Sequence, residues 1–426
     1  MNTTTASDDP QEKKARQFRS ICIPFTEEQY SGIVNDPLKY REYLGRMINN
    51  HPELFPHEIL HGYRMKDFYF SKKRDFPLRR IKLNTTGIQY TLRPSFVMPY
   101  MTGKTGEIED ALFLRKFDVP YWAISHIYGK NAMYWYRLEN QIGRNSLVGT
   151  TIKDPAKLPE NLLADEKHTR LSGEKHYIAM TVGNECILGA SLTTNAGEKA
   201  LTASYGVFKE EACQVKKDYS PKTVNIDGWA ATQNAWKTLF SAIIIIGCFL
   251  HVYIKIRDRT RKKYQAVFPE AASKLWDCYK AENKRSFSQR VSALVQWAEK
   301  NSLPAIFIDV FRKLRANRSL YSCAYDHPDA HRTSNMLDRL MQPMDRHLFS
   351  TRYFHGSLEA AELNIRGWAL IQNFAPYNPI TIKKHNGLSC PAERLNGKRY
   401  HDSWLENLLI STSLGGYSSP PQNPLQ

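Results

Sequence analysis

The chain has 426 residues, more than a single hydrophobic core usually serves, so two or more domains are expected. Lysine and arginine number 59 against 42 acidic residues, and the resulting net charge of +17 favours a polyanionic partner, with nucleic acid as the first candidate. The 7 cysteines form neither CxxC pairs nor the framework of a small secreted domain, which indicates a reducing, cytoplasmic compartment.

Two segments bear on targeting and membranes. Residues 1–20 are polar and charged without an apolar core, so they are not a secretory signal and are expected to form a disordered tail. The apolar run AIIIIGCF at 242–249 is shorter than the roughly 18 to 20 apolar residues of a spanning helix. We interpret it as a strand buried on both faces and expect no membrane partner.

The N-terminal third divides into two regions. Residues 21–106 mix aromatic and basic stretches and indicate no particular fold. Residues 107–155 have helical spacing, with Gly129 between two short helices and Arg137 and Arg144 assigned to the second. This pattern fits a helix-turn-helix whose second helix enters the DNA major groove. The alternative is an ordinary helical hairpin with Tyr134, Trp135 and Leu138 in its core.

The segment 156–257 has a definite order of elements. They are strands at 162–165, 175–182 and 186–192 with a turn at Gly183-Asn184, a helix at 196–215, a strand at 223–227, a short helix with Trp229 and Trp236, a strand at 242–249 and a basic helix from His251. This order predicts an α/β fold of the RNase H-like type, a mixed five-stranded sheet flanked by helices. In that fold one acid lies on the first strand and another ends the fourth, the positions of Asp165 and Asp227.

The remaining chain is predicted to be helical. Residues 258–330 carry no strand signal and form an all-helical insertion, after which 331–390 continue the core. There Asn335 is a plausible N-cap, and Asp338 lies in the first turn of the helix that follows. Residues 391–426 are a C-terminal segment, with a tail expected to be disordered from Thr412.

Three carboxylates brought together from a strand, a strand end and a helix suit phosphodiester chemistry. Oxygen ligands favour Mg²⁺, for which Mn²⁺ is a substitute, and a metal pair stabilises both the attacking and the leaving oxygen. Taken singly, Asp165 and Asp227 also fit the common strand-end or turn aspartate. Their position in this element order favours the catalytic interpretation, with Asp338 as third acid.

Several motifs resemble a known family. They are ADEKHT at 164–169, VNIDGWAATQNAWKTLF at 224–240, CFLH at 248–251, RTSNMLDRLMQPMDRHLFSTRYFHG at 332–356, YWYRLENQIGRNSLVGTT at 134–151 and AERLNGKRYHDSWLENLL at 392–409. Together they resemble the DDE transposases of bacterial insertion sequences, in the broad group related to Mutator-like elements. The similarity spans roughly residues 100 to 410.

The resemblance implies a helix-turn-helix ahead of an RNase H-like catalytic domain with a helical insertion. It implies cleavage and strand transfer at terminal inverted repeats of double-stranded DNA, then joining to target DNA by a homo-oligomer at the nucleoid of a prokaryotic cell. Asp165 and Asp227 match the family's first two acids, and Cys248 and His251 match its C-x-x-H. The third acid is more often Glu in the family, and the matching position here is Asp338.

Some assignments stay open at this stage. Asp345, Glu359 and Glu362 are rivals for the third acid, and Pro343 disturbs the helix that carries Asp338. Cys248 and His251 are expected beside the catalytic site. A structural zinc site would need a second ligand pair, and the remaining alternative is a buried cysteine with a satisfied core histidine.

Two further motifs allow a functional and a plainer interpretation. The basic run KIRDRTRKK at 255–263, with Lys255, Arg257 and Arg259, is expected to contact phosphates, although it also fits the solvated face of a helix. HEILH at 57–61 spells the zinc-protease signature HExxH, which needs a continuous helix, yet Gly62 follows at once and no third ligand is evident.

The leading hypothesis is therefore a DDE-type DNA transposase. The alternatives are a catalytically inactive DNA-binding protein descended from a transposase, and an RNase H-like nuclease without strand transfer.

Overall fold

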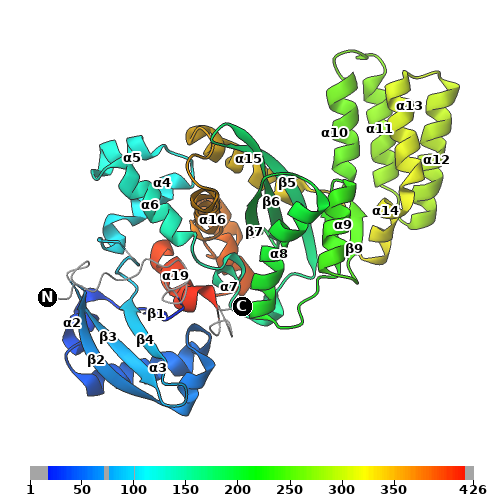
Figure 1. Ribbon diagram of the computed structural model, residues 1–426. Helices are drawn as coiled ribbons and strands as arrows, with labels where there is room; N and C mark the ends of the chain where they lie inside the picture. Colours follow the sequence, from blue (N-terminus) through cyan, green and yellow to red (C-terminus); the bar gives the residue numbers. More distant parts are fainter. Residues whose placement is uncertain (1–17, 72–75, 100, 418–426) are drawn as a thin grey trace.

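The computed structural model describes residues 18–71, 76–99 and 101–417, and it confirms a mixed α/β fold, with two mixed β-sheets. A four-stranded sheet lies at one end of the molecule, a five-stranded sheet at the centre, and a bundle of helices projects from the far side (Figure 1). The expected tail at 1–20 lies outside the described residues up to position 17, and Ser20 already begins the first strand.

The N-terminal region, for which the sequence indicated no fold, forms the four-stranded sheet in the order β1-β4-β3-β2. Its elements are β1 (Ser20–Ile23), α2 (Glu27–Ile33), α3 (Pro37–Asn50), β2 (Tyr63–Ser71), β3 (Phe76–Leu83) and β4 (Gln89–Pro94). Thr26 and Gln29 form a capping box at the start of α2, and Asp36 caps α3. Tyr30 and Tyr40 are fully buried and anchor these two helices to the core.

Four helices follow this sheet: α4 (Glu109–Arg115), α5 (Tyr121–Tyr128), α6 (Ala132–Ile142) and α7 (Leu147–Thr151). Gly129, at φ 69°, ends α5, and the Asn131 side chain caps α6, so the predicted Gly-jointed helix pair is present. Helix α6 ends at Ile142, so Arg144 follows the second helix and does not lie on it, contrary to the prediction. Gly143 is the C-cap residue of α6, and it lies in close contact with the backbone of another helix.

That partner is α16 (Leu358–Phe374), which packs against α6 through two glycines. A Cβ atom on Gly367 would lie 2.3 Å from the backbone oxygen of Glu139, and one on Gly143 would lie 1.8 Å from that of Leu363. Both contacts are with backbone atoms, which a rotamer change cannot relieve. The two helices therefore cross at a distance that only glycine permits.

We predict that Gly367→Ala lowers the free energy of unfolding by about 1–3 kcal/mol, the typical cost of overpacking a core. Gly32→Ala in α2 is the matched control, because a Cβ atom there meets nothing within 4 Å. That control should be neutral or stabilising, since alanine has the higher helix propensity. Urea denaturation of both variants measures the difference, and equal midpoints would contradict the close crossing.

The central sheet has the strand order β7-β6-β5-β8-β9. Its elements are β5 (Asn161–Leu171), β6 (Glu174–Gly183), β7 (Cys186–Thr193), α8 (Glu198–Val215), β8 (Thr223–Ile226), α9 (Ala230–Leu239) and β9 (Ile244–Gly247). Strands β5, β6 and β7 are antiparallel neighbours, whereas β8 is parallel to both β5 and β9. The predicted hairpin is confirmed, with Asn184 and Glu185 at positive φ in its turn.

Strand β5 is longer than predicted, so Asp165 lies within it rather than at its end. The strand continues because it pairs with β6 from Leu163 to Leu171. Its side chains alternate between two cores: Leu162 and Ala164 join the core that includes residues of α8 and α9, and Leu163 joins the core that includes residues of α15 and α16. Because side chains alternate along a strand, Asp165 lies on the side of Leu163, facing α15 and α16, and Glu166 lies on the side of Ala164, facing α8 and α9.

Residues 258–330 are helical as predicted, and together with α10 (Phe249–Thr260), which was predicted to belong to the catalytic core, they form a bundle with its own hydrophobic core. The bundle consists of α10, α11 (Phe268–Tyr279), α12 (Lys284–Lys300), α13 (Ala305–Ala316) and α14 (Arg318–Ser322). Fully buried Phe307 and Phe311 on α13 pack within it. In the described part of the chain, no helix is both long enough and apolar enough to span a membrane, and the run at 242–249 supplies β9.

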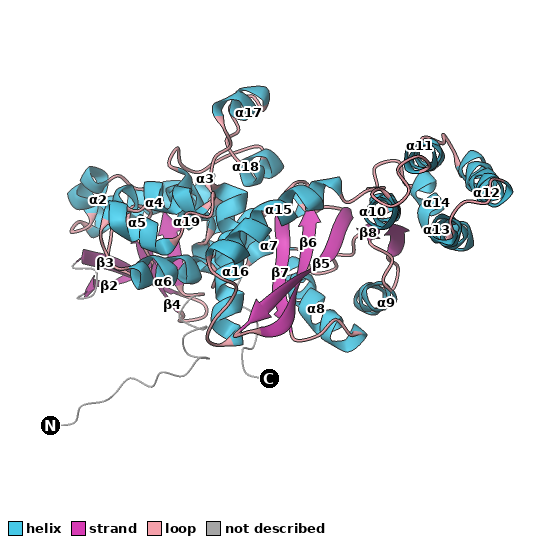
Figure 2. Cartoon of the chain, turned by 90° about the horizontal axis from the view of Figure 1, so that it is seen from above, coloured by secondary structure: helices cyan, strands magenta, loops and turns pink. Residues whose placement is uncertain are grey.

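The chain then returns to the central sheet through α15 (Asn335–Ser350) and α16, followed by α17 (Pro379–Lys384), α18 (Pro391–Asn396) and α19 (Trp404–Ser411). Helices α17 and α18 project from one side of the molecule (Figure 2). Two expectations were wrong here: Ser334, not Asn335, is the N-cap residue of α15, and the helix continues through Pro343 without a break.

The expectation of a disordered tail from Thr412 was wrong for residues 412–417. The Cys22 backbone N–H donates to Ser413 Oγ at 2.8 Å, and Leu414 is fully buried. These contacts attach the end of the chain to strand β1, a pairing that the local composition does not reveal. Residues 418–426 lie outside the described part.

Candidate active site

Two of the predicted acids lie on adjacent parallel strands of the central sheet. Strands β5 and β8 pair with Leu163 opposite Asn225, and continuing this register brings Asp227 level with Asp165. Asp227 directly follows the end of β8, and its Oδ1 accepts a hydrogen bond from the Trp229 backbone N–H at 2.7 Å. Since neighbouring strands are about 4.8 Å apart, the two carboxylates are close neighbours.

The third acid comes from α15, which packs on β5. Ser334 precedes this helix, and its hydroxyl donates to Asp338 Oδ2 at 2.8 Å. Two residues beyond Asp165 on β5, Lys167 Nζ lies 2.5 Å from Asp345 Oδ1 of the same helix. Asp165, Asp227 and Asp338 are together called the acidic site below.

The charges of Asp227 and Asp338 both act on Asp165. Burial, and then the charges of Asp227 and Asp338, raise the pKa of Asp165 from 3.8 to about 7. A backbone hydrogen bond from Glu166 N–H to Asp165 Oδ1, at 2.9 Å, opposes this only partly. The site therefore holds concentrated negative charge that a cation would neutralise.

The chemistry of the donor set fits Mg²⁺ or Mn²⁺, because all three side chains offer hard carboxylate oxygens. Within the described residues, no three histidine, cysteine, aspartate or glutamate side chains are yet grouped closely enough to hold a metal ion. Joint ligation would therefore require the carboxylates to rotate toward one another.

Cys248 and His251 border the acidic site. Cys248 follows β9, and its thiol donates to Ser334 Oγ at 3.2 Å, while the Ser334 backbone N–H donates to Cys248 Sγ at 3.2 Å. The Ser334 hydroxyl in turn donates to Asp338. This chain of hydrogen bonds connects Cys248 through Ser334 to Asp338 at the start of α15.

His251, one turn into α10, faces the acids directly. Its Nε2 lies 3.9 Å from Asp165 Oδ2. Burial lowers the pKa of His251, but the effects of Cys248, Asp227 and Asp338 outweigh it and raise the pKa overall. His251 Nδ1 is buried and has no hydrogen-bond partner within the described residues. The side chain is therefore suited to contact substrate or to orient Asp165.

Sequence reasoning missed Ser334 and Glu166. Glu166 Oε1 accepts hydrogen bonds from Tyr205 on α8 and Thr232 on α9, both at 2.8 Å, on the opposite face of the sheet from Asp165. Burial is the main reason that the pKa of Glu166 is raised to about 7. The carboxylate ties β5 to α9, which follows Asp227. The sequence signal that could have identified Glu166 is an acidic residue within a strand that contains an apolar run.

Two of the three rival third acids have other partners, and the third is exposed. Asp345 pairs with Lys167, and Glu362 Oε1 accepts a hydrogen bond from Ser191 on the far edge strand β7. Glu359 is exposed in the first turn of α16. Only Asp338 among these four is a source of the raised pKa of Asp165 in the described structure.

The basic candidates are dispersed. Arg137 is exposed on α6, and Arg144 is half-buried beyond that helix. Lys255 and Arg259 share the exposed face of α10, whereas Arg257 pairs with Asp258 at 2.8 Å. Helix α10 begins beside the acidic site, and its basic side chains lie further along the helix. They therefore place positive charge at increasing distance from the three acids.

The HExxH motif has the wrong backbone for a zinc protease. Residues His57–His61 form a 3-10 helix that ends at Gly62, with φ 98°. The motif requires a regular α-helix so that both histidines share one face. The zinc-protease alternative therefore has no structural support.

Comparison with protein-family models and with curated protein sequences finds no match for this chain. Function is therefore inferred from the acidic site and the fold around it.

One prediction tests the destabilising effect of an ionised Asp165, which arises first from its burial and then from the charges of Asp227 and Asp338. In EDTA at pH 8, Asp165→Asn should stabilise the protein by on the order of 1 kcal/mol, because a pKa unit corresponds to about 1.4 kcal/mol and solvent screens part of the effect. The folded pKa of about 7 lies above the ordinary 3.8, so the stability that protonation provides is complete below about pH 4 and lost as pH rises through 7. Melting temperatures at pH 4 and pH 8 measure it, and an equal shift at both would contradict it.

Proposed function

We propose that the protein is a DNA transposase that cleaves and joins strands at the acidic site, within an RNase H-like catalytic domain. The observation that carries the proposal is the convergence of Asp165 from β5, Asp227 from the end of β8 and Asp338 from α15. Each of these three acids lies within one of the sequence motifs that resemble those of DDE transposases.

The topology supports the proposal. The strand order β7-β6-β5-β8-β9, with three antiparallel strands followed by two parallel ones, is the order expected of an RNase H-like sheet. The resemblance implies a helical insertion, and a helical bundle lies in the chain between β9 and α15. The net charge of +17 suits double-stranded DNA as substrate.

Each side chain has a defined part in the proposed reaction. Asp165, Asp227 and Asp338 would hold Mg²⁺ or Mn²⁺, which when bound supplies Lewis-acid stabilisation of the attacking and leaving oxygens. Ser334 and Cys248 fix Asp338 through hydrogen bonds, and His251 lies beside Asp165. Bases such as Lys255 and Arg259 offset the phosphate charge, and Arg137 remains a candidate for recognition of the element's terminal inverted repeats.

The experiment uses labelled DNA that flanks the coding sequence on both sides, with an unlabelled plasmid as target. We expect cleavage at inverted repeats in Mg²⁺, none in EDTA, and joining of the 3′ ends to the plasmid. Cleavage without joining would identify a nuclease. Binding without cleavage would identify an inactive, transposase-derived DNA-binding protein, and either outcome would overturn the proposal.

A further inference from the structure

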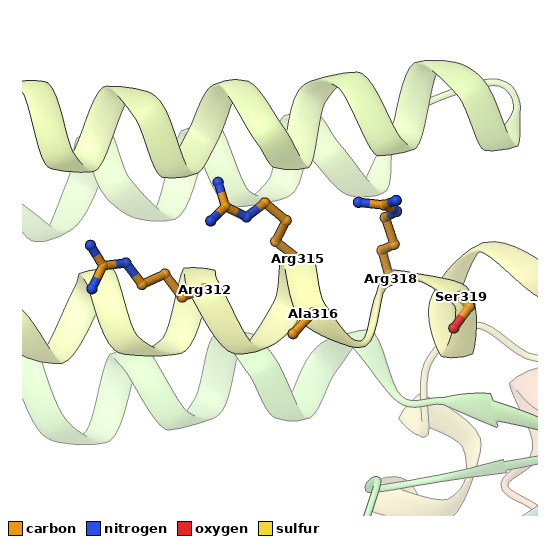
Figure 3. Close-up of a pocket in the computed structure, with 5 residues that line it drawn as sticks. All are labelled: Arg312, Arg315, Ala316, Arg318 and Ser319. Carbon is orange, nitrogen blue, oxygen red and sulfur yellow. The ribbon is translucent and has the colours of Figure 1, made fainter.

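Three arginines line a hollow on the helical bundle. Arg312 and Arg315 lie on α13, Arg318 begins α14, and their side chains extend in a row to the same side (Figure 3). The hollow has a volume of about 550 Å³ and is completed by Ala316 and Ser319. These three arginines are called the arginine row. Their spacing in the sequence is that of any charged helix face.

The arginine row carries unbalanced positive charge. Arg312 is neutralised by Glu299 on α12, with the closest nitrogen and oxygen atoms 2.8 Å apart. Within the described part of the chain, the guanidinium groups of Arg315 and Arg318 form no ion pair or hydrogen bond. Two like charges beside an open hollow repel each other until an anion enters, and guanidinium groups bind phosphate oxygens in a bidentate manner.

The position of the row connects it with the acidic site. The Tyr321 side chain of α14 packs against β9 so tightly that a Cβ atom on Gly247 would lie 2.8 Å from its ring. The Cys323 thiol, just after α14, donates to the Ile245 backbone oxygen of the same strand at 3.4 Å. Gly247 directly precedes Cys248 of the site. Helix α14 therefore extends from the arginine row to the strand that borders the acids.

We propose that the arginine row binds backbone phosphates of the DNA that flanks the cleavage site. Arg312 and Arg315 are three residues apart on α13, about 4.5 Å of helix rise, and Arg318 follows three residues later at the start of α14, so the three guanidinium groups are placed to reach neighbouring parts of one backbone. Backbone contacts of this kind position DNA without reading its sequence. This inference rests on the proposed function, because the acidic site supplies the reason for DNA to lie there.

The test is DNA affinity as a function of salt, measured in EDTA by fluorescence anisotropy with a labelled duplex of the flanking DNA and the full-length protein. The variant is Arg315→Gln with Arg318→Gln. The slope of log affinity against log salt is negative. Loss of two phosphate contacts should make it less steep by about 1.8, since each contact contributes about 0.9. The matched control, Lys313→Gln with Arg285→Gln, removes two exposed charges of the same bundle outside the hollow.

An unchanged slope in the arginine variant, or an equal change in the control, would overturn the inference. Circular dichroism of both variants verifies that they fold. Arg315 is half-buried and the other three positions are exposed, and none of the four belongs to the bundle core. Because the assay needs no catalysis, its outcome is separate from that of the cleavage assay. Cleavage with an unchanged slope refutes the arginine row alone, whereas a changed slope without cleavage refutes the proposed function alone.

Discussion

Replacing Asp227 by asparagine is expected to reduce DNA cleavage by about a thousandfold while DNA affinity stays unchanged. Asparagine keeps the oxygen that accepts the Trp229 backbone N–H, so the turn after β8 survives. It removes the negative charge that a divalent cation needs. Stabilisation of both reacting oxygens by metal is worth several kcal/mol, and each 1.36 kcal/mol is a factor of ten in rate.

Asp345→Asn is the matched control for this variant. Asp345 lies on α15 near the acids but pairs with Lys167, and more than half of its side chain is exposed, at 57%. Its loss should change the cleavage rate less than tenfold, because an exposed ion pair contributes about 1 kcal/mol or less. Cleavage of labelled flanking DNA in Mg²⁺, with anisotropy for binding, compares the two. A near wild-type rate for Asp227→Asn would make Asp227 a turn residue.

Arg115→Ala is expected to lower the free energy of unfolding by about 3–5 kcal/mol. Arg115 and Glu139 form a buried ion pair at 2.7 Å, with side chains that are 1% and 0% exposed. Arg115 also donates to the Val119 backbone oxygen and contacts His347 Nδ1 at 3.0 Å. Without the guanidinium group, the Glu139 carboxylate would stay buried without its cation, which is why the loss is large.

The exposed pair of Arg80 and Asp67 provides the comparison, with side chains 31% and 38% exposed. Arg80→Ala should cost about 1 kcal/mol or less, because solvent screens the pair. Urea denaturation of both variants measures the two losses on one scale. Equal losses would show that the network of Arg115 does not hold α4, α6 and α15 together.

Sequence patterns predicted the central sheet well because its strands are buried on both faces. Short apolar runs such as the one in β9 are distinctive, and the dipeptide Gly183-Asn184 predicted the β6–β7 hairpin, whose turn residues are Asn184 and Glu185. The N-terminal sheet escaped prediction because strand β2 is exposed or half-exposed along most of its length and therefore lacks a clear apolar pattern. The C-terminal residues escaped it because their contacts, such as that of Ser413 with Cys22, join opposite ends of the chain.

The acids of the candidate site could be predicted from their positions in the element order. Ser334 could not, because its role depends on the approach of α15 to Cys248, a contact between residues 86 positions apart. Glu166 lies next to Asp165 in sequence but on the other face of the sheet, where α8 and α9 provide its partners. Such roles follow from tertiary packing, which periodicity and turn signals do not encode.

The most direct test of the acidic site is the anomalous diffraction of Mn²⁺ in crystals of the protein with its flanking DNA. A peak in contact with the carboxylate oxygens of Asp165 and Asp227, lost in Asp227→Asn, is the result we expect. The account would be contradicted if the protein cleaves DNA in Mn²⁺ but the crystals show the metal bound elsewhere, with none in contact with the three acids.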